Sequence, residues 1–214
     1  LSDIHCTDRK IPQSERLDRI APAIRTLGSF DKVSLVFTGD LSFSGKCNQI
    51  KCGKHFIGYV ISSLANTFNC GFIDTIIVPG NHDIQIPSEG HSFNEISKWN
   101  KDTRITSELM LMNPFFEYAA SKCCFKNNKL VDFKTLLLQD KKIQFTLLNS
   151  APFSTLSTDD KELHYFPDSV FEEIKSHNLS EKPDYNIVIM HHSFEWFEWD
   201  TKIKLKELMF KADL

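Results

Sequence analysis

Four short apolar runs, rich in residues that favour strands, recur along the chain at positions 33–37, 73–78, 143–148 and 185–190. Each run is shorter than an ordinary helix, and each ends at a turn-forming or polar residue. Runs of this kind are typical of strands that are buried on both faces. We therefore predict a strand at each of these positions.

Between the runs, apolar residues recur at the three- and four-residue spacing of amphipathic helices. The pattern predicts helices over residues 17–27, where Pro22 interrupts it, and over 56–68 and 170–177. Strands that alternate with helices indicate an α/β domain whose sheet faces are covered. Residues 84–140 fit this alternation poorly, and we interpret them as a mostly helical insertion, or cap, over one edge of the sheet.

Several polar residues follow directly after predicted strands, and two more open the chain. These residues are Asp3, His5, Asp40, Asn81, His82 and His191. Because the carboxyl ends of the strands share one edge of an open α/β sheet, we expect these side chains to converge there. Carboxylate, imidazole and amide groups in this mixture suit Mn²⁺, Fe or Zn²⁺. The pattern therefore predicts a metal site at this edge.

The backbone around these residues contains glycines that favour such a site. Gly39 precedes Asp40 and Gly80 precedes Asn81, so the chain can turn tightly and approach a bound group. A carboxylate such as that of Asp40 can bridge two ions. Two metal ions about 3.5–4 Å apart can hold a phosphate, activate a water and stabilise the leaving oxygen.

The composition narrows the classes of partner. The chain has 214 residues, is 41% hydrophobic and 25% charged, and carries a net charge of −3. This balance is typical of a soluble globular protein and argues against a strongly basic surface that binds duplex nucleic acid. No apolar run approaches the roughly 20 residues that a membrane span needs. The six cysteines form no CxxC pair, which favours reduced thiols and a cytoplasmic protein.

Four sequence blocks resemble those of the calcineurin-like metallophosphoesterase family. The family pattern is D-x-H, G-D, G-N-H-[DE], a lone His and then G-H-x-H. The chain has DIH at residues 3–5, GD at 39–40, GNHD at 80–83 and a histidine at 191. The resemblance spans residues 2–193 and implies an α/β fold in which a two-sheet β-sandwich is flanked by helices, in four layers ordered α/β/β/α.

The last block of the family pattern, G-H-x-H, does not occur in these 214 residues. We therefore expect residues 1–214 to be a metallophosphoesterase domain that is truncated at both ends. We also expect the natural chain to continue past Leu214 into that block.

The resemblance implies a two-metal site. Asp3, His5 and Asp40 would hold one ion, and Asp40, Asn81 and His191 would hold the other. Mn²⁺ is the expected metal, with Fe and Zn²⁺ as alternatives. A hydroxide between the two ions would be the nucleophile.

The resemblance also implies two catalytic residues that do not bind metal. His82 would contact the phosphate and protonate the leaving alkoxide as general acid. Asp83 would orient the imidazole ring of His82.

The substrate class is indicated by the segment GDLSFSG at residues 39–45. It lacks the arginine of the G-D-x-V-D-R-G block of protein serine/threonine phosphatases, and it is more similar to the bacterial phosphodiesterase branch. We expect a phosphodiester or phosphomonoester substrate, with a nucleotide or nucleic acid as first choice. The alternative is a metal-poor scaffold or interaction module of the same fold. As partners we expect the phosphate ester and no membrane, and we leave an oligomer or a fused C-terminal domain open.

Two assignments near the last strand stay open. His191 follows the strand directly and is the preferred ligand, while His192 either touches substrate or packs. An aromatic cluster comes next, and packing is its favoured interpretation over stacking on a nucleobase. Its members are Phe194, Trp196, Phe197 and Trp199.

Overall fold

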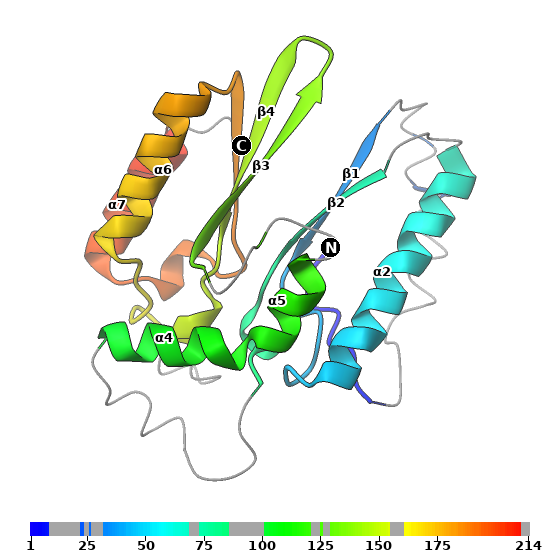
Figure 1. Cartoon of the computed structure of the whole chain (residues 1–214), viewed down its shortest axis with the longest axis horizontal. Coiled ribbons are helices and arrows are strands. Elements are labelled where there is room, and N and C mark those ends of the chain that lie inside the picture. Colours follow the sequence, from blue (N-terminus) through cyan, green and yellow to red (C-terminus); the bar gives the residue numbers. More distant parts are fainter. Residues whose placement is uncertain are drawn as a thin grey trace.

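The computed structural model of the chain has two sheets that lie between helices (Figure 1). It describes residues 1–8, 22–23, 26, 32–68, 73–85, 101–120, 125, 129–154 and 161–210. Most of the helix predicted over residues 17–27 lies outside the described residues.

The first sheet is a parallel pair of strands, β1 (Val33–Thr38) and β2 (Ile73–Val78). Both strands occupy predicted positions. The helix between them, α2 (Cys47–Phe68), begins nine residues before the predicted start at residue 56. Because Thr38 is paired with Val78 at the end of the ladder, the loops that follow the two strands start side by side. This register brings the loop residues after position 38 next to those after position 78.

The second sheet contains three strands, β3 (Val131–Leu138), β4 (Lys141–Leu148) and β5 (Tyr185–Ile189). β4 lies in the middle, antiparallel to β3 and parallel to β5. The sequence predicted β4 and β5 but not β3, which forms the end of the range 84–140 interpreted as mostly helical. Most of β3 is only partly buried or exposed, so its sequence lacks the continuous apolar run of a central strand.

Two helices form the earlier part of the range 84–140, namely α4 (Lys101–Leu111) and α5 (Asn113–Ala120). Lys54 of α2 lies over the ring of Tyr118 in α5, 5.9 Å from its centroid, so α5 packs beside α2. That this range is an insertion or cap stays a prediction.

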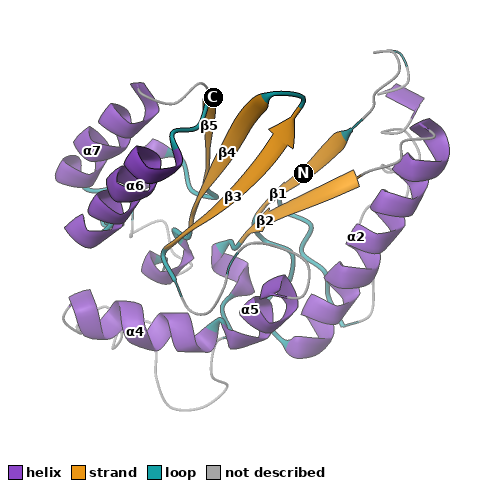
Figure 2. Cartoon of the chain, turned by 45° about the horizontal axis from the view of Figure 1, so that its top comes forward, coloured by secondary structure: helices purple, strands orange, loops and turns teal. Residues whose placement is uncertain are grey.

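The outer helices complete the layers. α6 (Asp168–Glu181) contains the predicted helix 170–177, and α7 (Trp199–Phe210) follows β5. Figure 2 shows α6 and α7 on the side of the second sheet and α2 on the side of the first sheet. The elements therefore follow the predicted order α/β/β/α. None of the described helices combines the length and the apolar composition that crossing a membrane requires.

Candidate metal centre

A cavity of about 480 Å³ opens where β1 and β2 end. Five of the predicted site residues line it, and they are Asp3, Asp40, Asn81, His82 and His191. His5 lies beside this group, because its Nε2 is 3.7 Å from Oδ2 of Asp40. The structure therefore brings together residues that are up to 188 positions apart in the sequence.

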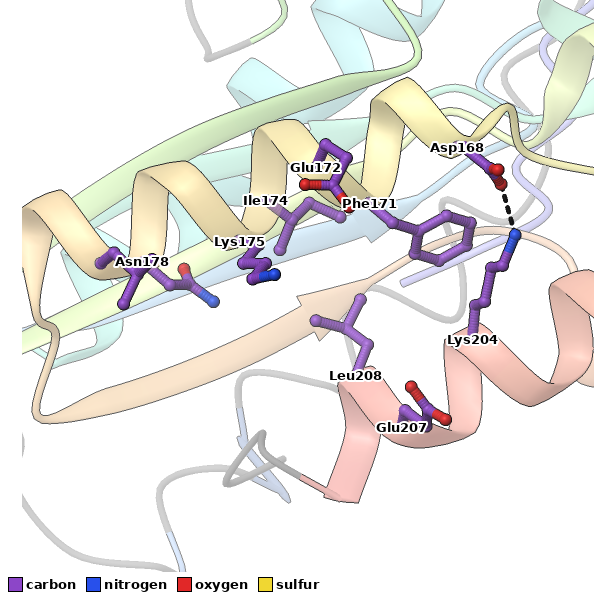
Figure 3. Close-up of a pocket in the computed structure, with 10 residues that line it drawn as sticks. Asp168, Phe171, Glu172, Ile174, Lys175, Asn178, Lys204, Glu207 and Leu208 are labelled. Carbon is purple, nitrogen blue, oxygen red and sulfur yellow. Dashed lines mark hydrogen bonds and ion pairs between the residues drawn. The ribbon is translucent and has the colours of Figure 1, made fainter.

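A larger groove, of about 610 Å³, lies elsewhere, between α6 and α7 (Figure 3). Phe171, Ile174 and Leu208 form its apolar part, and Asp168 pairs with Lys204 at one end. Neither of the metal-ligand groups found among the described residues lies in this groove. The smaller cavity is therefore the candidate site.

Asp40 is the centre of the candidate site. Its side chain is almost fully buried, and its Oδ2 lies 3.5 Å from Nε2 of His191 as well as 3.7 Å from Nε2 of His5. Two groups of possible metal ligands share Asp40, one with His5 and His82 and the other with Asp3 and His191. Within each group the ligand atoms lie within 4.8 Å of one another. A carboxylate shared in this way is suited to bridging two ions.

These two groups divide the ligands differently from the arrangement that the family resemblance implies. Asp3 is grouped with Asp40 and His191 instead of with Asp40 and His5. Its Oδ1 nevertheless lies 3.9 Å from Nε2 of His5. His82, expected to bind no metal, lies within ligand distance of His5 and Asp40. The position of the His82 ring therefore suits either a general acid or a metal ligand.

Three of the predicted ligands have a left-handed backbone conformation, with φ of 56° at Asp3, 50° at His5 and 56° at Asp40. Residues other than glycine adopt this conformation rarely, and such conformations cluster at functional sites. Backbone hydrogen bonds hold it here, because the N–H of Asp3 donates to Gly39 O and that of His5 donates to Asp40 O. The strain is thus concentrated where the ligand side chains must converge.

The contacts of His191 provide a direct test of whether the residues fit a cation. Nδ1–H of His191 donates to the carbonyl of Thr38 over 2.6 Å, which leaves a lone pair on Nε2. Nε2 lies 3.0 Å from Oδ1 of Asn81 and 3.5 Å from Oδ2 of Asp40. With a neutral imidazole, these three acceptor atoms repel one another unless a cation lies among them. A histidine that donates its second ring N–H to a backbone carbonyl is also the usual form of a metal ligand. The donor set therefore fits a divalent metal ion.

A family model described as calcineurin-like phosphoesterase matches residues 1–214. The chain belongs to the calcineurin-like phosphoesterase family. The family depends on divalent metal ions and acts on phosphoesters, in agreement with the ligand groups around Asp40. A comparison with curated proteins gave no match.

In this calcineurin-like phosphoesterase, glycines allow the two loops to approach closely. A Cβ atom on Gly80 would lie 2.2 Å from Oδ1 of Asp40, and one on Gly39 would lie 2.5 Å from Nδ1 of His191. Gly39 also has a φ of 96°, which disfavours other residues. Both positions therefore require glycine for the ligands to keep their places.

Gly80→Ala is expected to weaken Mn²⁺ binding by about tenfold or more, because the new methyl group displaces the Asp40 carboxylate. Gly58→Ala is a matched control, since a Cβ atom on this exposed glycine of α2 would meet no atom within 4 Å. The control should bind Mn²⁺ normally and raise the free energy of unfolding by up to about 1 kcal/mol. Calorimetric titration with Mn²⁺ measures the first effect, and equal affinity in both variants would contradict the steric argument.

His82 is held by two contacts of its own. Its backbone N–H donates to Oδ1 of Asp40 over 3.0 Å, and its ring Nδ1–H donates to the carbonyl of Phe43 over 2.8 Å. The ring also meets that of His5 edge to face, with centroids 4.6 Å apart. The Phe43 carbonyl thus fixes the orientation of the His82 ring, and Nε2 is the ring nitrogen that remains for proton transfer or metal binding.

The predicted role of Asp83, to orient the His82 ring, is not the one that the structure gives it. The carboxylate of Asp83 is fully buried and accepts N–H groups of Leu41 (3.3 Å), Ser42 (2.8 Å) and Gly80 (3.0 Å). Asp83 therefore joins the loop after β1 to the loop after β2. The sequence suggested His82 as the partner because it is adjacent in the chain, whereas two of the three N–H donors, Leu41 and Ser42, come from a loop some 40 residues away.

Burial raises the pKa of Asp83 from its ordinary value of 3.8 to about 6, and the nearby charge of Asp40 adds to this effect. The three N–H donors oppose the shift but do not cancel it. A carboxyl whose pKa is higher in the folded state binds its proton more tightly there. Its contribution to stability is therefore full below about pH 4 and is lost as the pH rises through about 6.

In the metal-free protein, this loss should amount to about 2 kcal/mol of unfolding free energy between pH 4 and pH 7. Asp83→Asn removes the titrating group, so the variant should lack this part of the pH dependence even if it is less stable throughout. Urea unfolding of both proteins in the presence of a chelator measures the difference. Parallel pH curves would show that Asp83 keeps an ordinary pKa.

His192, whose role the sequence left open, lies on the wall of the cavity and in neither ligand group. Its Nδ1 is 2.8 Å from the hydroxyl of Ser150. Burial lowers the pKa of His192 to about 2, and the nearby rings of His164 and His191 add to this effect, so the ring is neutral. His191 is thus the ligand candidate of the pair.

The fold places the members of the aromatic cluster after β5 in different environments. Phe197 is fully buried and stacks on Phe166 at 5.3 Å between centroids, as the packing interpretation predicts. Trp199 is 71% exposed, whereas Trp196 lines the cavity. Ser150 and Ser154 could not be recognised from the sequence, because serine in a loop after a strand is an ordinary turn residue and carries no signal of its own.

Proposed function

We propose that this protein hydrolyses a phosphodiester or phosphomonoester, with a nucleotide or nucleic acid as substrate and two divalent metal ions as cofactors. The ligands would be Asp3, His5, Asp40, Asn81 and His191, with Mn²⁺ as the expected metal. The observation that carries the proposal is the buried Asp40 carboxylate, which two groups of ligand atoms share.

When bound, the ions would supply charge stabilisation for the phosphoryl oxygens and would activate water. The chain itself would hold the proton for the leaving oxygen. Nδ1–H of His82 is used by the Phe43 carbonyl, so a protonated ring would donate from Nε2. The backbone bond from His82 to Oδ1 of Asp40 would keep this acid at a fixed distance from the phosphoryl group.

A metal-poor scaffold of the same fold is the competing hypothesis. A scaffold has no need for three left-handed ligand residues or for acceptor atoms that face one another around Asp40. We therefore favour the enzyme. Among the described residues, Cys6, Cys47 and Cys52 are free thiols, and they support the cytoplasm as the compartment.

The test combines metal content with turnover. The purified protein, loaded with Mn²⁺ and freed of excess metal, should contain two ions per chain by elemental analysis and should hydrolyse bis-p-nitrophenyl phosphate. A chelator should remove both the ions and the activity, and Mn²⁺ should restore them. A protein that retains no metal and releases no p-nitrophenolate would support the scaffold hypothesis.

A further inference from the structure

The cavity has a second wall that the metal chemistry does not use. It contains Ser154, His192, Ser193 and Trp196, which line the cavity together with the candidate ligands. A phosphoryl group placed at Asp40 would direct its organic substituent into the remaining space of the 480 Å³ cavity, toward this wall. The chemistry of the wall therefore bears on what that substituent is.

His192 offers this cavity a hydrogen-bonding group. The hydroxyl of Ser150 accepts the backbone N–H of His192 over 3.2 Å and lies 2.8 Å from Nδ1 of its ring. Nδ1 is therefore used by Ser150, and Nε2 is the second hydrogen-bonding atom of the ring. The residue is only 6% exposed and lies in the lining of the cavity. A ligand that forms a hydrogen bond with this imidazole is selected over one that cannot.

Trp196 supplies a flat apolar ring next to His192. Its ring centroid lies 5.6 Å from that of His192 and 5.5 Å from that of His164. The backbone is fixed as well, because His164 N–H donates to Trp196 O over 3.0 Å. The indole is therefore held in place while it remains part of the cavity wall.

We propose that Trp196 and His192 bind the organic group of the phosphoester, and that this group carries a planar heteroaromatic ring such as a nucleobase. The ring would stack on the indole of Trp196 and would form a hydrogen bond with Nε2 of His192 through a polar atom on its edge. An alkyl substituent would satisfy neither contact. This inference rests on the proposed function, because it places the phosphoryl group at Asp40.

The kinetic test uses two esters with the same leaving group. Thymidine 5′-(p-nitrophenyl phosphate) carries a nucleoside and methyl p-nitrophenyl phosphate does not, so the ratio of their kcat/KM values reports on the nucleoside, and the variants of Trp196 and His192 report on the contribution of its base. Trp196→Ala should lower this ratio by about tenfold or more, and Trp196→Phe should lower it less. His192→Gln, which keeps an N–H donor of different reach, should lower it by less than His192→Phe, which has none. Trp199→Ala and His55→Gln, at exposed positions, are the matched controls and should leave it unchanged.

A binding measurement separates the failure of this inference from that of the proposed function. Thymidine 5′-monophosphate should bind the Mn²⁺-loaded protein more tightly than methyl phosphate, and Trp196→Ala should remove the difference in calorimetry. If neither ester is hydrolysed but this Trp196-dependent preference is seen, the proposed function fails and the binding site stands. If both esters are hydrolysed and each variant of Trp196 and His192 lowers the kcat/KM of both esters by the same factor, the binding site is refuted. It is also refuted if thymidine 5′-monophosphate and methyl phosphate bind with the same affinity.

Discussion

Asp40→Ala is expected to reduce turnover of bis-p-nitrophenyl phosphate to the background rate and to leave fewer than two metal ions per chain. The Asp40 carboxylate faces both His5 and His191, so its loss removes a ligand from each ion at once. The substitution also removes the acceptor of the His82 backbone N–H, which frees the residue proposed as the acid. The two effects act on the same reaction, and their sum should leave no measurable catalysis.

The fold should survive this substitution, because Asp40 lies in a loop after β1 and a buried negative charge is costly in the metal-free protein. Circular dichroism and urea unfolding in the presence of a chelator check this point. Asp140→Ala, in the exposed turn between β3 and β4, is the control carboxylate and should retain both metal and activity. Two tightly bound ions in Asp40→Ala would disprove the bridging role.

His82→Ala should reduce turnover by about 10²–10⁴-fold for an ester with a poor leaving group, the usual effect of losing a general acid. The loss should be much smaller for a p-nitrophenyl ester, because p-nitrophenolate leaves without a proton. Metal content should stay close to that of the parent. Steady-state rates on an alkyl phosphoester and on a p-nitrophenyl ester, measured beside elemental analysis, provide the comparison.

The same experiment decides whether His82 is an acid or a ligand, since it lies within ligand distance of His5 and Asp40. A ligand's removal would lower metal content and would affect both kinds of ester alike. His55→Ala, at an exposed position of α2, controls for the loss of an imidazole elsewhere and should change neither quantity.

Much of the fold could be predicted from local patterns, because most of its strands are short and nearly continuous apolar runs. β1, β2, β4 and β5 were found in this way. β3 was not, because an edge strand with partly exposed residues has no such run and mixes Lys134 and Thr135 with apolar positions. The start of α2 was placed too late for a similar reason: its first turns contain Asn48, Lys51 and Lys54, which obscure the apolar stripe.

The sequence alone determined the chemical types of the candidate ligands and their places after strands. Parallel pairing of β1 with β2 then follows ordinary rules of α/β folds, so the convergence of Asp40 with Asn81 and His82 could be expected from the sequence. Only the tertiary structure decided which atoms face one another. It placed Asp83 on the N–H groups of Leu41 and Ser42 and the His82 ring on the Phe43 carbonyl.

The part of the cavity that contains His192 and Trp196 was also decided by tertiary structure. Ser150 and His192 are 42 residues apart and meet because the loops after β4 and β5 leave the second sheet at the same edge. Neither residue type indicates a binding site by itself, and an aromatic segment is equally typical of a core, which is where Phe197 lies. The physical reason is that a hydrogen bond or a ring contact depends on separations of a few ångströms between distant segments. A sequence pattern reports burial along one segment and not the position of its neighbour.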